Sequence, residues 1–207
     1  MRLQAGVRFG GLVVAVALAT SIAGAADKQA EAPAMSAEEQ AMMQKWHEFM
    51  TPGEPHKLLA AKAGSWVGKV TMWQTPDAPP ETSPATSEQK LIMDGRYLED
   101  HTQGSFMGMP FAGHGITGYD NMKKKFVSTW IDNMGTGIMM SEGTYDAATK
   151  TFTYMGEGPD VMTGKYKPMK GIEKMTGPDQ WSMEMLNQTA DGKGWWKMME
   201  IVYTRKK

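Results

Sequence analysis

The chain has 207 residues, of which 41% are hydrophobic and 22% are charged, the proportions of a folded globular protein of one or two domains. Its formal net charge of −1 provides no basic surface for phosphate groups, so we expect no nucleic-acid partner. Cysteine is absent, which excludes disulfides, cysteine zinc ligands and a thiol nucleophile. Methionine is frequent, with 21 residues against 6 Phe and 6 Tyr.

Residues 1–25 have the three parts of a cleavable secretion signal. Arg2 and Arg8 carry the positive charge, residues 10–19 form an apolar run too short to span a bilayer, and small residues at 23–25 mark the cleavage position. The alternative is an uncleaved anchor helix. We expect cleavage, no membrane span in the mature chain, and a location in the periplasm or outside the cell.

The next segments predict a tether followed by a helix. Residues 26–35 have too few apolar side chains to pack, which is typical of a flexible tether. Ser36 and Glu39 form a capping box, which predicts a helix over residues 36–50. Apolar residues three and four positions apart form one stripe on this helix: Met42, Met43, Trp46, Phe49 and Met50. We expect the stripe to pack on the domain that follows, and the alternative is a methionine-rich flap over a ligand.

The predicted barrel domain spans residues 55–207. Residues 54–61 read as one or two helical turns with Pro55 at the permitted first position, and the chain from Gly64 onward reads as short strands separated by turns. Asp94-Gly95 is the strongest turn, and further turns begin near Asp120, Asp146 and Asp191. This spacing predicts an all-β fold, an antiparallel barrel of about nine or ten strands. Four prolines between residues 75 and 84 predict a loop outside the sheet, at one mouth of the barrel.

Two groups of residues carry a resemblance to known barrels. Gly64-x-Trp66 opening the first strand, with Arg205 ending the last, resembles the lipocalin and calycin pattern, which implies that Trp66 and Arg205 close the barrel base through a cation–π contact. A longer series resembles the bacterial family called domain of unknown function 1579, over residues 50–205: Asp94-Gly95-Arg96-Tyr97-Leu98, Gly108-Met109-Pro110-Phe111, Trp130-Ile131-Asp132 and Gly143-Thr144-Tyr145-Asp146. That family is regarded as lipocalin-like and has no settled activity, so the resemblance implies a fold and names no reaction.

The histidines are the first candidates for chemistry. His47, His56, His101 and His114 show no zinc-ligand spacing such as His-x-x-x-His, so we expect no metal ion and no cofactor. His114 lies between two glycines, where backbone can approach a ligand closely, and we assign it to ligand binding. The alternative is an ordinary strand histidine that faces solvent or packs.

Trp130 and Asp132 are the second candidates. They alternate on one strand and so share a face, where the indole can stack on a ligand and the carboxylate can hold a polar group. The alternative is a core tryptophan beside a turn-capping aspartate. Arg96, a candidate partner of Asp132 or Glu99, completes the predicted ligand-binding set with Met109 and Tyr119.

The methionines are compatible with two roles, as metal ligands or as the lining of an apolar interior. Met183 and Met185 alternate on one strand, and thioethers of this kind suit Cu(I) or fill an adaptable apolar interior. We interpret the chain as a secreted barrel that binds a small apolar or amphiphilic molecule, and the sequence favours a binding protein over an enzyme. The alternatives are an acid–base enzyme that uses His114 with Asp132, and a copper-binding protein.

Overall fold

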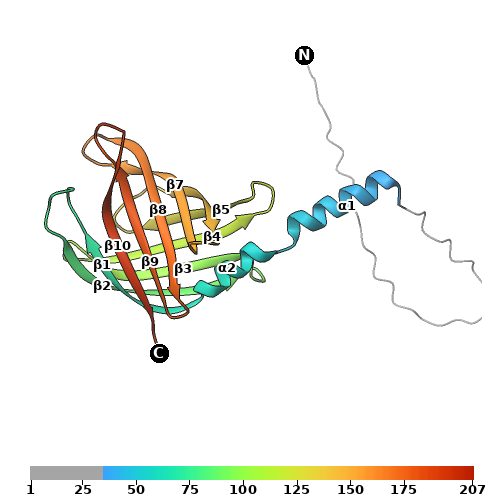
Figure 1. Cartoon of the computed structure of the whole chain (residues 1–207), viewed down its shortest axis with the longest axis horizontal. Coiled ribbons are helices and arrows are strands. Elements are labelled where there is room, and N and C mark those ends of the chain that lie inside the picture. Colours follow the sequence, from blue (N-terminus) through green and yellow to red (C-terminus); the bar gives the residue numbers. More distant parts are fainter. Residues whose placement is uncertain (1–34) are drawn as a thin grey trace, which may run out of the picture.

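Among residues 35–207, which the computed structural model describes, ten antiparallel strands close into one barrel, and β1 pairs with β10 (Figure 1). The strands are β1 (Gly64–Met72), β2 (Glu81–Ile92), β3 (Tyr97–Phe106), β4 (Met109–Asp120), β5 (Lys125–Asp132), β6 (Met139–Asp146), β7 (Thr151–Asp160), β8 (Lys165–Gly177), β9 (Gln180–Gln188) and β10 (Trp195–Arg205). The predicted all-β antiparallel barrel is confirmed. The predicted signal segment and nearly all of the predicted tether lie outside the described residues.

A short helix and a buried core seal one end of the barrel, which we call the closed end. Helix α2 (Glu54–Lys62) contacts β2, β3 and β4 there, and its Leu59 is 1% exposed. Two apolar clusters meet at this end: Leu59 with Leu98, Phe126, Phe152 and Tyr154, and Trp66 with Val70, Ala85, Trp181, Ile201 and Tyr203. The opposite end, where β1 finishes and β10 begins, we call the open end.

The interior near the closed end also holds polar groups. Asp100 accepts hydrogen bonds from Ser87 at 2.8 Å, from Thr102 at 2.9 Å and from the Gln89 amide at 3.2 Å. Burial raises the pKa of Asp100, although the hydrogen bonds from Ser87 and Thr102 act in the opposite direction. These bonds satisfy a carboxylate that an apolar core alone would not tolerate.

Helix α1 (Ala37–Met50) begins as predicted and packs differently. Ser36 Oγ accepts from the Glu39 amide at 3.2 Å, and the Glu39 carboxylate accepts from the Ser36 amide at 2.8 Å, which completes the capping box. No residue of α1 is buried, so the expectation that its apolar stripe packs on the barrel is wrong. Figure 1 shows α1 pointing away from the barrel beyond α2.

Only the last turn of α1 is tied to the barrel, which explains this orientation. The Asn121 side chain donates to the carbonyl oxygens of Glu48, Phe49 and Thr51 at 2.9–3.1 Å. Arg96 donates to the carbonyl oxygen of Met50 at 3.0 Å. These bonds satisfy orphan carbonyls at the helix end and leave the apolar stripe in solvent. Among the described residues, neither helix has the length and apolar character to cross a bilayer.

The proline-rich loop is shorter than predicted, because β2 begins at Glu81 and includes Pro84. Pro84 pairs with Lys69 of β1, while the ladder between β2 and β3 begins only at Ala85. One edge of β2 is therefore unpaired at Pro84, so the missing N–H of proline costs no ladder hydrogen bond.

Candidate functional site

The interior of the open half is lined by methionine and tryptophan. Strand alternation and register place one set of apolar side chains on the inward face of neighbouring strands: Met72, Trp130, Met139, Met169, Met183, Met185 and Met199. All seven are only half-buried, whereas the largest inward-facing residues of the closed end, such as Trp66, Phe126 and Trp181, are buried. Met72, Met183 and Met199 also pack against the core cluster that contains Trp66. Side chains in a completely filled barrel would be buried throughout, so solvent reaches the interior at the open end.

Trp130 lies flat over the glycines that flank His114. A Cβ added at Gly115 would stand 2.9 Å from Cε3 of Trp130, and one added at Gly113 would collide with the same indole. Phe111 stacks on Trp130, with ring centroids 6.5 Å apart. The two glycines therefore make room for the chain's own tryptophan, which corrects the interpretation that they admit a ligand beside His114.

Asp132 orients this indole and also caps a turn. Its Oδ2 accepts from Nε1 of Trp130 at 3.0 Å, and its Oδ1 accepts from the amide of Met134 at 2.9 Å. The bond to the Met134 amide is the turn cap that the sequence left as one alternative, and the binding of a ligand's polar group by this carboxylate stays a prediction. The bond fixes the ring in the inward direction and leaves one polar group beside an apolar surface.

His114 does not lie with Asp132. In the register of β4 with β5, Gly113 is opposite Asp132, so the neighbouring His114 points to the other face of the sheet. On that outer face His114 lies beside Glu99 and His101. Because the barrel wall separates His114 from Asp132, the geometry does not support an acid–base pair made of these two groups.

The rest of the predicted set is dispersed. Tyr119 belongs to the closed-end core, where its ring meets the edge of Phe126 at 5.0 Å between centroids. Arg96 is also at the closed end and holds the last turn of α1 through the carbonyl of Met50, not Asp132. Met109 follows the β3–β4 turn and is 49% exposed. Of the six predicted binding residues, only Trp130 and Asp132 are in contact with each other inside the barrel.

Trp66 and Arg205 meet at the closed end. The Arg205 guanidinium lies 4.1 Å above the Trp66 ring and donates to the carbonyl oxygen of Ala63 at 2.9 Å. The Trp66 indole donates to the carbonyl oxygen of Lys62 at 2.8 Å. Gly64 has a φ of +135°, and any side chain there would collide with Arg205. These contacts join the end of α2 to the first and last strands.

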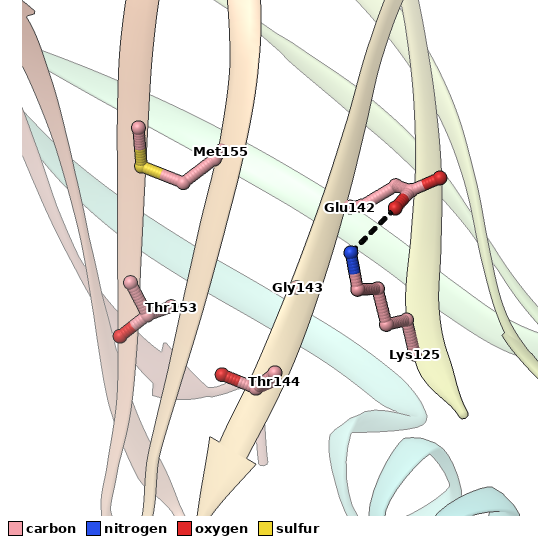
Figure 2. Close-up of a pocket in the computed structure, with 6 residues that line it drawn as sticks. All are labelled: Lys125, Glu142, Gly143, Thr144, Thr153 and Met155. Atoms are coloured by element: carbon pink, nitrogen blue, oxygen red, sulfur yellow. Dashed lines mark hydrogen bonds and ion pairs between the residues drawn. The ribbon is translucent and has the colours of Figure 1, made fainter. Parts of the chain in front are cut away.

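The outer wall of the barrel carries a hollow. An open depression of about 370 Å³ is lined by Lys125, Glu142, Gly143, Thr144, Thr153 and Met155 (Figure 2). Glu142 is held by Lys123 at 2.7 Å and by Lys125 at 2.9 Å, and these hydrogen bonds lower its pKa to about 2. Since its charges already pair with one another, this hollow offers a ligand little that is unsatisfied, and the interior is the better candidate.

His101 and Glu99 are the residues that sequence reasoning missed. Met107 and Gly108 both have positive φ, 50° and 78°, and form a two-residue hairpin turn between β3 and β4. Counting outward from that turn places His101 opposite His114. The expectation of no metal site rested on spacing along the chain, which does not detect groups that meet across two strands.

A closed barrel of ten antiparallel strands, in which each strand pairs with its neighbours in chain order, defines the class of up-and-down β-barrels. The chain belongs to the family described as protein of unknown function (DUF1579), whose model matches residues 51–205. A search of curated proteins found no match.

Two solved structures match this chain. The crystal structure of Rv2717c from M. tuberculosis shares 15% sequence identity at a TM-score of 0.56, covering 76% of this chain and 100% of that one. A redesigned β-barrel shares 14% identity at a TM-score of 0.37, covering 72% of this chain and 96% of that one. At this identity the first likeness supports the barrel fold alone.

Proposed function

We propose that this protein binds a small apolar or amphiphilic molecule in the open half of its barrel. The observation that carries the proposal is the set of inward-facing methionines and Trp130 that are only half-buried although they point into the barrel. An apolar molecule that entered there would remove this surface from water. Burial of about 200 Å² of apolar surface contributes about 5 kcal/mol before the costs of association.

The side chains suit a ligand whose shape is not fixed in advance. Methionine has three rotatable bonds and a polarizable sulfur, so Met183, Met185 and Met199 can adjust to the ligand. Trp130 offers a rigid face held by its bond to Asp132. The Asp132 carboxylate provides one polar anchor at the rim, which favours an amphiphilic ligand with its donor group toward the open end.

The proposal includes export to the periplasm or the outside of the cell. It rests on the charged, apolar and small-residue parts of residues 1–25 in the sequence. Cleavage there leaves residues 26–35 as a tether ahead of α1 and the barrel. The barrel would then meet ligands outside the cytoplasm.

Removing the Trp130 ring tests the location of the site. We expect Trp130→Ala to raise the dissociation constant of a neutral apolar fluorescent dye about tenfold, since an aromatic contact contributes about 0.5–1.5 kcal/mol beyond its buried area. The matched control is Trp195→Ala, because Trp195 lies on the outer face beneath Lys170, 4.5 Å from its ring centroid. A dye titration that weakens equally in both variants, or in neither, would contradict the assignment.

A further inference from the structure

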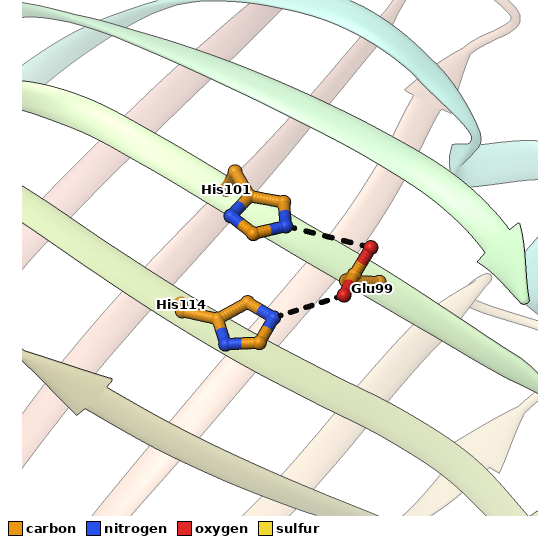
Figure 3. A group of neighbouring side chains, drawn as sticks. All are labelled: Glu99, His101 and His114. Carbon is orange, nitrogen blue, oxygen red and sulfur yellow. Dashed lines mark hydrogen bonds and ion pairs between the residues drawn. The ribbon is translucent and has the colours of Figure 1, made fainter.

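Three side chains on the outer wall of the barrel form a compact group that the proposed function does not use. We name Glu99, His101 and His114 the His–Glu cluster (Figure 3). Nε2 of His114 lies 3.2 Å from Oε1 of Glu99, and Nε2 of His101 lies 3.4 Å from Oε2. The two imidazole rings stack with centroids 4.4 Å apart and an angle of 12° between their planes.

The strand register builds this group. His101 of β3 is directly opposite His114 of β4, and Glu99 is two residues before His101, so all three side chains project from one face. Each residue lies inside a strand of a closed sheet and not on a loop. The backbone positions of the three residues are therefore fixed before any ion arrives, and only the side chains have to adjust to bind it.

The distances fit a tetrahedral zinc ion. Zinc bonds to imidazole nitrogen and carboxylate oxygen are about 2.0–2.2 Å long, so tetrahedral ligand atoms lie about 3.4 Å apart. The separations of 3.2 Å and 3.4 Å are close to this value, and all three ligand atoms lie within 4.8 Å of one another. These separations join the two imidazole nitrogens to different oxygens of Glu99, and the stacked rings must turn before both nitrogens point at one ion. Two histidines and one glutamate form a known zinc-binding set that leaves a fourth position for water.

The charge of Glu99 and the exposure of His101 also favour binding of a cation at this cluster. Glu99 already attracts a cation, the Lys90 ammonium, which lies 3.3 Å from Oε2. That lysine is 68% exposed, so it can swing away at little cost when a divalent ion takes its place. The His101 side chain is 51% exposed, which opens the cluster to ions from solvent. We infer that Glu99, His101 and His114 form a zinc site on the outer wall, with water completing the coordination.

The test is a Zn²⁺ titration of the full chain, prepared without a histidine tag and stripped with chelator. We expect one ion per chain and shifts of the His101 and His114 ring signals in nitrogen-15 NMR spectra, with His47 and His56 unchanged. His114→Ala should weaken binding roughly 100-fold or more, because loss of a direct ligand costs at least as much as loss of its supporting groups. The matched control is His47→Ala on exposed α1, which should bind as the wild type does.

Glu99→Gln provides a second variant that keeps the side-chain shape, and it should also weaken binding at least about tenfold. The inference is overturned if the dissociation constant for Zn²⁺ is larger than about 1 mM. It is equally overturned if a folded variant lacking both His101 and His114 binds Zn²⁺ as tightly as the wild type.

Discussion

Trp66→Ala is expected to lower the free energy of unfolding by about 3–5 kcal/mol, the range for removal of a buried aromatic side chain. Trp66 is 0% exposed and meets the ring of Trp181 edge-on, with centroids 6.2 Å apart. The substitution would also leave the carbonyl of Lys62 without its indole donor and Arg205 without the ring beneath it. Urea denaturation measures the loss as a fall in the transition midpoint.

Trp46→Ala is the matched control for this prediction. Trp46 is 52% exposed on α1, so the same change there should alter the unfolding free energy by less than about 0.5 kcal/mol. A Trp66→Ala midpoint as close to wild type as the Trp46→Ala midpoint would show that the closed end is not the stabilising core of the barrel.

Lys62→Ala should cost about 3–5 kcal/mol, because removing one partner of a buried ion pair leaves the other charge uncompensated. The Lys62 ammonium lies 2.7 Å from Glu173, with side chains only 6% and 17% exposed. It also lies 4.4 Å from the centroid of the Trp181 ring. Thermal or urea unfolding of the purified variant measures the loss.

Two comparisons separate the ion pair from general damage to α2. Lys57→Ala removes an exposed lysine of the same helix that pairs with Glu54, and it should cost less than about 1 kcal/mol. The double variant Lys62→Met with Glu173→Gln removes both charges and should recover most of the lost stability. If the double variant is less stable than Lys62→Ala, the lost stability does not come from the unpaired Glu173 charge.

Local patterns in the sequence are sufficient to predict the barrel and the beginning of α1. The capping box needs only residues within one helical turn, and turns such as Asp94-Gly95 fix where strands end. The prediction that the apolar stripe of α1 packs on the barrel was wrong because periodicity identifies an apolar face without showing what covers it. The direction of that helix depends on Asn121 and Arg96, which belong to distant turns.

The candidate sites depend on pairings that local patterns do not reveal. Alternation correctly places Trp130 and Asp132 on one face, but the inward direction of that face requires the closed barrel. His114 has glycines on both sides that suggest an open approach, yet the indole of Trp130 fills that space from the strand next to it. The His–Glu cluster can be recognised only once the β3–β4 register is known.

Native mass spectrometry of the exported protein, purified from its own cells without refolding, tests the central claim most directly. The account predicts a polypeptide mass that begins near residue 26, with an additional organic mass that is lost on denaturation. Retention of Cu(I) in place of an organic molecule would favour the copper alternative. A bare polypeptide mass that stays unchanged after incubation with a lipid extract would contradict the claim that the open half of the barrel binds an apolar or amphiphilic ligand.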